Sequence, residues 1–180
     1  MTPPLADTAP LLVTPRLELW RPRAGDEHAL LAMMESEAMR RFLGARTGSL
    51  ADEAARLLRN AGSWALYGYG CFVARRPGKD AVAGIVGVFH SWRGYGEGLD
   101  DTPEAGWIVA EPLWGQGYAS EAMAAAIAWF DREIGRRRIA CMVEDGNVAS
   151  LRMAARLGFI RYGSHRPDGA ERELVLLERI

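Results

Sequence analysis

The sequence predicts a single α/β (α+β) domain in which about seven strands and four helices follow one another along the chain. Its 180 residues suit one domain. Hydrophobic residues make up 49% and charged residues 25%, as is typical of globular proteins. Segments with the two-residue period of a strand alternate with segments at helical spacing. We expect the domain to occupy residues 14–180, after a flexible, Pro-rich tail at residues 1–13.

The first part of the chain indicates one strand and two helices. Apolar and polar residues alternate in RLELWRP, residues 16–22, as in a half-buried strand. Residues 28–42 have apolar side chains at helical spacing and predict one helix. Residues 50–66 predict a second helix, for which Ser49 and Asp52 offer caps. We place the apolar face of this second helix at Ala54, Leu57, Leu58 and Ala61.

The rest of the chain predicts six strands and two helices. The turns RPGKD and RPDG each join two strands into a hairpin, because Pro fixes φ and Gly tolerates unusual φ values. The strands are expected at residues 71–75, 81–89, 104–110, 138–143, 159–163 and 171–177, and the helices at residues 119–130 and 147–157.

The stretch WGQGYASEA, residues 114–122, places Gly115 and Gly117 between a predicted strand and a predicted helix. The first N–H groups of a helix and its dipole can hold a phosphate, and glycines let an anion approach the backbone. The same glycines could simply make a tight connection. A nucleoside triphosphatase loop would need a Lys that is absent from this stretch, and a dinucleotide fingerprint would need a third Gly where Ser120 stands.

A second informative block is EDGNVASLRMAARLGF, residues 144–159. Asn147 is suited to cap a helix, and Gly158 is suited to end it before Phe159 starts the next strand. Taken alone, these residues are the usual signals for the start and the end of a helix.

Four blocks in this order resemble the GNAT superfamily of acyl-CoA-dependent N-acyltransferases, and within it the branch that includes ribosomal-protein N-terminal acetyltransferases. The blocks are TPRLEL at residues 14–19, EAGWIV at 104–109, WGQGYASEA at 114–122 and NVASLRMAARLGF at 147–159. The resemblance implies a single-domain GNAT fold, with a mixed central sheet of about six or seven strands flanked by about four helices.

The resemblance also implies acetyl-CoA as acyl donor. It implies that main-chain groups of Ile108 and Val109 meet the pantetheine arm, and that Asn147 contacts the cofactor. The coenzyme A diphosphate would lie against the turn formed by Trp114, Gly115, Gln116, Gly117, Tyr118, Ala119 and Ser120.

The implied reaction is attack of a neutral primary amine on a thioester carbonyl. Most amines are protonated near neutral pH, so a carboxylate must remove a proton, directly or through water. Glu104, in the EAGW block, is our candidate base. Ser150 and Tyr162 are alternative donors to the departing thiol. Cys141 is disfavoured as a covalent nucleophile because no His and acid partner is identifiable, so we expect direct transfer.

The acceptor is expected to be a protein N-terminus or a small-molecule amine. The loop at residues 90–103, with Trp92, Tyr95, Glu97, Asp100 and Asp101, is either an acceptor-binding surface or a solvated loop. The alternative to an enzyme is a GNAT-fold sensor that binds acyl-CoA without transferring the acyl group.

The charge balance and the cysteine content limit which partners and ligands we expect for this protein. Twenty-two Lys and Arg nearly balance 23 Asp and Glu, which gives no overall case for a nucleic-acid partner. Cys71 and Cys141 lack metal-site spacing, so we expect no metal and no disulfide framework. We find no export signal or membrane span, and expect a cytoplasmic protein. A monomer and a homodimer both stay open.

Overall fold

The computed structural model describes residues 8–41, 48–96 and 98–180. Most of the expected tail (residues 1–7), the end of the first expected helix (Phe42) and Glu97 of the loop lie outside the described residues. The strands are β1 Leu12–Val13, β2 Glu18–Trp20, β3 Cys71–Arg75, β4 Val82–Ser91, β5 Thr102–Val109, β6 Ile139–Glu144, β7 Ile160–His165 and β8 Leu174–Arg179. The helices are α1 Asp26–Met33, α2 Glu37–Arg40, α3 Leu50–Tyr67, α4 Tyr118–Phe130 and α5 Val148–Arg156, with a 3₁₀ turn at Glu111–Leu113 and a π turn at Asp131–Gly135.

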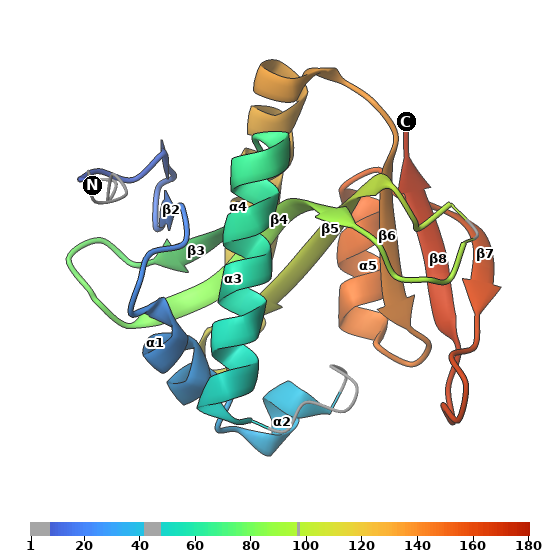
Figure 1. Cartoon of the computed structure of the whole chain (residues 1–180), viewed down its shortest axis with the longest axis horizontal. Helices are drawn as coiled ribbons and strands as arrows, with labels where there is room; N and C mark the ends of the chain where they lie inside the picture. Colours follow the sequence, from blue (N-terminus) through green and yellow to red (C-terminus); the bar gives the residue numbers. More distant parts are fainter. Residues whose placement is uncertain (1–7, 42–47, 97) are drawn as a thin grey trace.

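All eight described strands form one mixed sheet in the order β1-β2-β3-β4-β5-β6-β8-β7 (Figure 1). Neighbouring strands are antiparallel except β5 and β6, which are parallel. The predicted class is confirmed, and the described residues form eight strands instead of six or seven and five α-helices instead of four. The added strand is β1, a two-residue edge strand that pairs with β2 inside the segment expected as a tail.

The first predicted helix is in fact two helices, α1 and α2. The Met34 N–H donates to the carbonyls of both Leu30 and Leu31, and Ser36 is extended. Helix α1 therefore ends before Ser36, and α2 begins after it. Met34 and Met39 are both buried, at 1% and 4% exposure. A straight helix would turn residues five apart toward different faces, and the break between α1 and α2 lets both methionines reach the core.

Helix α3 occupies the predicted segment, but its buried face is different. The predicted cap Ser49 accepts a hydrogen bond from the Asp52 N–H at 3.1 Å. Leu57 is buried as expected, whereas Leu58 is 71% exposed, so our placement of Leu58 on the core face was wrong. The buried face instead includes Asn60, whose side chain pairs with both the N–H and the C=O of Cys71 at 2.8 Å. This polar contact fixes α3 against the start of β3.

The two faces of the sheet have separate cores. Helices α4 and α5 pack on one face, in a cluster that includes Ala105, Cys141 and Val143. Helices α1 and α3 cover part of the other face through Leu30, Leu57, Val73 and Val82. Farther along this second face, Leu99 of the β4–β5 loop covers Ala140 and Leu176. Because side chains alternate along a strand, Glu104 points to the same face as Ala140, away from α4.

The parallel strands β5 and β6 separate toward their carboxyl ends. In the part of the chain that the structure describes, Glu104 and Ala140 are the one pair in register between them. Beyond this pair the strands diverge, as the arrowheads in Figure 1 show. Helix α4 follows β5 and helix α5 follows β6, so both helices begin at the open end. A ligand can therefore meet two helix N-termini and an opened sheet edge at one place.

Candidate active site

The glycine turn has the geometry of an anion-binding turn. Gly115 and Gly117 have φ values of 72° and 81°, in the left-handed region that glycine tolerates best. Gly117 occupies the N-cap of α4, and within the described ranges no side chain caps this helix. The first-turn N–H groups are therefore left for an external acceptor. The flanks are fixed, because Trp114 Nε1 donates to the Val109 carbonyl at 2.6 Å and Gln116 Nε2 donates to the Pro112 carbonyl at 2.8 Å.

The first turn of α5 faces the same opening. The Asn147 side chain accepts a hydrogen bond from the Ser150 N–H at 3.1 Å, which confirms Asn147 as the predicted cap. Ser150 Oγ accepts from Nε1 of Trp107, on β5, at 3.2 Å. A hydroxyl that accepts one hydrogen bond still has its own hydrogen to donate. Trp107, which was not among the residues predicted from the sequence, thus links β5 to α5. It holds the Ser150 side chain and leaves the hydroxyl hydrogen of Ser150 available to donate.

Glu104 is buried and held in an ion pair. It is 2% exposed, and its carboxylate accepts from Arg93 Nε at 2.9 Å and Nη2 at 2.6 Å. Burial alone would lower the pKa of Arg93, but its hydrogen bonds to Glu104 and the charge of that carboxylate raise the pKa above its ordinary value. Sequence reasoning selected Glu104 and missed Arg93, because nothing in the local pattern links the two.

Tyr162 lies on the same face of the sheet as Glu104, and Ser150 lies on the opposite face. It is at the bulge between Arg161 and Gly163 in β7 and packs beside Ala140 and Leu176. The Arg138 guanidinium lies 5.1 Å from the centre of the Tyr162 ring. Helix α5, which carries Ser150, packs on the opposite side of β6. The two alternative donors to the thiol are therefore separated by the sheet.

The described residues of the loop between β4 and β5 cover the face of the sheet that carries Glu104. The Asp100 carboxylate accepts hydrogen bonds from the N–H groups of Arg93, Gly94 and Gly96 at 2.6 to 2.8 Å. These contacts lower the pKa of Asp100 below its ordinary value, led by the bond from Gly96. The ring of Tyr95 stacks on His165 with centroids 4.2 Å apart, which joins the loop to β7. The loop thus forms one wall beside the buried ion pair, and Trp92 on it is 69% exposed.

The two cysteines lie in the core of the protein. Cys71 and Cys141 are both buried and unbridged. Burial raises the pKa of the Cys71 thiol to about 12 and also raises the pKa of the Cys141 thiol, and the charge of Glu104 adds to both shifts. Across the described ranges we find no cluster of His, Cys, Asp and Glu that could hold a metal ion. In the same ranges, no helix is both long and apolar enough to cross a membrane.

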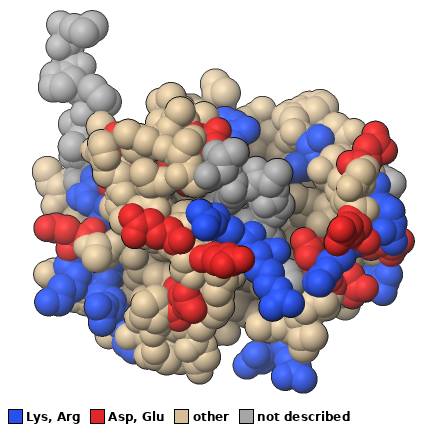
Figure 2. Space-filling view, turned by 90° about the horizontal axis from the view of Figure 1, so that it is seen from below, with Lys and Arg blue, Asp and Glu red and all other residues tan. Residues whose placement is uncertain are grey.

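Figure 2 shows the end of the molecule toward which β5 and β6 point. Acidic and basic side chains of the described residues are interspersed on this face. Recognition of a phosphate here would therefore depend on backbone N–H groups and individual arginines.

Comparison with known proteins agrees with this geometry. Residues 16–160 match the acetyltransferase (GNAT) domain family. A solved GNAT-family acetyltransferase of Bordetella pertussis is 36% identical, with a TM-score of 0.83, over 94% of this chain and 98% of its own. An uncharacterised N-acetyltransferase of Bacillus subtilis, YoaA, is 26% identical over 158 residues, which cover 86% of this chain and 85% of that protein. The ribosomal L7/L12 alpha-N-protein acetyltransferase RimL, solved with coenzyme A, has the same fold at 19% identity, with a TM-score of 0.75 over 94% of this chain and 96% of its own.

The opened sheet, the glycine turn and these similarities define an acyltransferase that takes its acyl group from acetyl-CoA. The chain belongs to the GNAT family of acetyltransferases. Its activity is acetyl-CoA-dependent N-acetylation, and these comparisons do not favour the alternative of a sensor without transferase activity.

Proposed function

We propose that the chain moves the acetyl group of acetyl-CoA directly to a primary amine, either a protein N-terminus or a small molecule. The observation that carries this proposal is the separation of β5 from β6 beyond Glu104 and Ala140, with the N-termini of α4 and α5 at the open end. In this proposal, the diverging ends of β5 and β6 let the donor on the side of the glycine turn meet the acceptor on the side of Glu104. Donor and acceptor can thus approach the reacting carbonyl from opposite sides of the sheet.

On the donor side, the diphosphate lies against the glycine turn and the first turn of α4. Gly115 and Gly117 lack the Cβ atoms that would obstruct the phosphate oxygens, and the dipole of α4 favours their negative charge. The pantetheine arm follows the edge of β5 at Ile108 and Val109 into the opening. Asn147, at the N-terminus of α5, borders the same opening.

On the acceptor side, Glu104 removes a proton from the attacking amine through an ordered water. Arg93 uses two of the roughly four acceptor positions of the carboxylate, which leaves room for a water on Glu104. The Glu104 side chain is only 3% exposed, so the amine does not contact the carboxylate directly. A water between them carries the proton from the amine to Glu104. Tyr162 and the β4–β5 loop then border the acceptor.

The leaving group departs toward Ser150. The amine nitrogen bonds to the acetyl carbon, the carbon–sulfur bond breaks, and the thiolate takes a hydrogen bond from the Ser150 hydroxyl. Cys141 takes no part, since burial keeps its thiol protonated and a protonated thiol is a poor nucleophile. The two buried, unbridged cysteines also fit our proposal that the protein works in the reducing cytoplasm.

The base is tested by comparing Glu104→Gln with Glu178→Gln. Glu178 also pairs with an arginine, Arg138, at 2.7 Å, and so is a matched control. Release of coenzyme A thiol is followed over a range of pH, with a peptide bearing a free N-terminus and then a small primary amine as acceptor. We expect Glu104→Gln to lower kcat by about 100-fold while acetyl-CoA binding is retained, because proton removal is lost. We expect Glu178→Gln to keep most of the activity.

Full activity of Glu104→Gln across pH would show that Glu104 is not the base. Thermal unfolding with acetyl-CoA, NAD and ATP checks donor binding separately, since a ligand of the folded state raises Tm. We expect a shift with acetyl-CoA alone, and equal shifts with ATP or NAD would contradict the donor assignment.

A further inference from the structure

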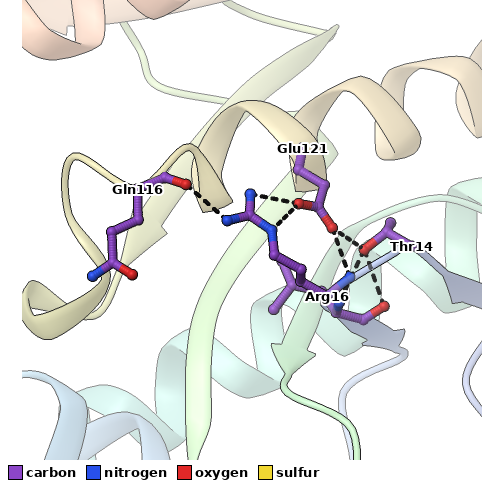
Figure 3. A network of polar contacts seen from close by, with 5 residues as sticks. Thr14, Arg16, Gln116 and Glu121 are labelled. Carbon is purple, nitrogen blue, oxygen red and sulfur yellow. Dashed lines mark hydrogen bonds and ion pairs between the residues drawn. The ribbon is translucent and has the colours of Figure 1, made fainter.

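The segment Thr14-Pro15-Arg16, called the TPR segment below, precedes β2 and lies directly against the glycine turn. Arg16 and Gln116, which are in contact, are 100 residues apart in the chain. Figure 3 shows Thr14 and Arg16 surrounding Glu121, which lies one turn into α4. The Glu121 carboxylate accepts from Thr14 Oγ1 at 2.6 Å, from the Arg16 N–H at 3.0 Å and from Arg16 Nε at 2.6 Å. Nη2 of Arg16 is also 2.6 Å from this carboxylate.

Glu121 would oppose diphosphate binding if it were bare. A carboxylate at a helix N-terminus is favourable for an empty helix, but it repels a phosphate that binds at the same end. Burial raises the pKa of Glu121, but the hydrogen bonds from Thr14 and Arg16 and the charge of Arg16 outweigh burial and lower it. Glu121 is therefore ionised at neutral pH, and Arg16 supplies the charge that compensates it.

Arg16 also contacts the turn itself. Its Nη1 donates to the Gln116 carbonyl at 2.8 Å, and its guanidinium lies 4.2 Å from the centre of the Tyr118 ring. In a trans peptide the carbonyl and the next N–H point in opposite directions. Holding the Gln116 carbonyl toward Arg16 therefore directs the Gly117 N–H away from Arg16, on the other side of the turn.

We propose that Arg16 is a positioning residue for the diphosphate of acetyl-CoA: it neutralises Glu121 and orients the peptide between Gln116 and Gly117. This inference rests on the proposed function of the turn. It gives the TPR segment a part in donor binding, through Glu121 and the Gln116 carbonyl and without direct contact with the phosphates.

The test is calorimetric titration of acetyl-CoA into the full chain and its variants, with steady-state kinetics alongside. The variants are Arg16→Gln, Arg16→Lys, Glu121→Gln and the double variant Arg16→Gln/Glu121→Gln. The control is Arg179→Gln, because Arg179 forms a comparable two-bond pair with Asp131, at 3.1 and 2.6 Å, between other parts of the chain. Circular dichroism and Tm verify that each variant is folded.

We expect Arg16→Gln to weaken acetyl-CoA binding by about tenfold, with the loss in KM for acetyl-CoA and not in kcat. The double variant should recover a large part of that affinity, because the uncompensated carboxylate is gone. Arg16→Lys should lie in between, since lysine keeps the charge but cannot bridge Glu121 and Gln116 as a fork. Arg179→Gln should lower Tm without changing the affinity.

Two results would overturn the inference while wild-type acetyl-CoA binding stands. Unchanged affinity in folded Arg16→Gln would make the contact a structural tie only. Weakened affinity without any recovery in the double variant would show that neutralising Glu121 is not how Arg16 supports binding. If Arg16→Gln does not fold, the same decision rests on Arg16→Met, which also removes the charge, with and without Glu121→Gln. Absence of acetyl-CoA binding by the wild-type chain would instead refute the proposed function.

Discussion

At the scale of single residues, Ser150 is held by contacts from two directions. Its N–H is capped by Asn147, and its hydroxyl oxygen accepts from Trp107 on the neighbouring strand. These two contacts leave the hydroxyl hydrogen as the group that can serve the departing thiolate. Tyr162, the alternative donor, lies across β6 beside Arg138. Position therefore favours Ser150 for the leaving group and Tyr162 for the acceptor side.

Ser150→Ala tests this assignment. We expect kcat to fall by about tenfold, because one hydrogen bond to a charged group is lost in the transition state. KM for acetyl-CoA should change little. Release of coenzyme A thiol under saturating donor measures the effect, with Ser164→Ala, at an exposed position of β7, as control. Full kcat in Ser150→Ala, together with a loss in Tyr162→Phe, would reverse the two roles.

At the scale of elements, the structure could be predicted from the sequence where local signals decide it. The bounds of α3 follow from its cap Ser49 and from Gly68, which ends it with φ of 78°. The glycine turn was predicted because its position between a strand and a helix is visible in sequence. These features depend on neighbours within a few residues, so a single sequence contains them.

The features that were missed depend on contacts across the chain. The break between α1 and α2 arises from the burial of two methionines, and Leu58 is exposed because Asn60 takes the inward direction to reach Cys71. Arg16 and Glu121 lie in two separate sequence blocks, and nothing local in either block predicts that they pair. The pairing of Arg93 with Glu104 was missed for the same reason: two charges 11 residues apart show no preference for each other until the strands are placed.

The strand–turn–helix unit makes its own prediction through Gly117. A Cβ at this position would lie 3.5 Å from Arg16 Nη2, an ordinary contact, but φ of 81° strains any L side chain. We expect Gly117→Ala to lower the free energy of unfolding by about 1 kcal/mol and to weaken acetyl-CoA binding as well. Urea denaturation and calorimetric titration measure the two effects.

Gly62→Ala is the matched control for this substitution. Gly62 lies in α3, where an added Cβ meets no described atom within 4 Å apart from its chain neighbours and the backbone of its own helix. Alanine there should stabilise the fold by about 0.5 to 1 kcal/mol and leave binding unchanged. Unchanged stability and unchanged binding in Gly117→Ala would contradict our account of the turn.

At the scale of the whole molecule, two carboxylates link stability to pH. Glu121 and Asp100 have pKa values below their ordinary values of 4.5 and 3.8. A carboxylate whose pKa is lower in the folded chain stabilises the fold fully above its unfolded pKa, and this stabilisation is lost as pH falls through its folded pKa. We therefore expect the free energy of unfolding to decrease as pH falls below about 4.5.

Urea denaturation between about pH 7 and about pH 3 measures this dependence. In Glu121→Gln the decrease should be smaller, because one of the two linked groups no longer titrates. An equally steep decrease in this variant would show that the contacts of Glu121 with Thr14 and Arg16 do not persist in solution.

At the scale of the whole molecule, our proposal places the two substrates on opposite faces of one sheet. The glycine turn, Asn147 and Ser150 border the opening from the side of α4 and α5, while Glu104 and the β4–β5 loop border it from the other side. In our proposal, the two substrates meet where β5 and β6 diverge beyond Glu104 and Ala140. Transfer from donor to acceptor then needs no covalent intermediate on the protein.

The most direct test is an amide ¹H–¹⁵N NMR titration of the full chain with acetyl-CoA. Our account expects the largest shifts at the amides of Gly117, Tyr118, Ala119 and Ser120, because the diphosphate oxygens would accept their hydrogen bonds. The amides of β7 and β8, away from the opening, should move little. Saturable binding of acetyl-CoA that leaves the amides of the glycine turn unmoved would contradict the central claim.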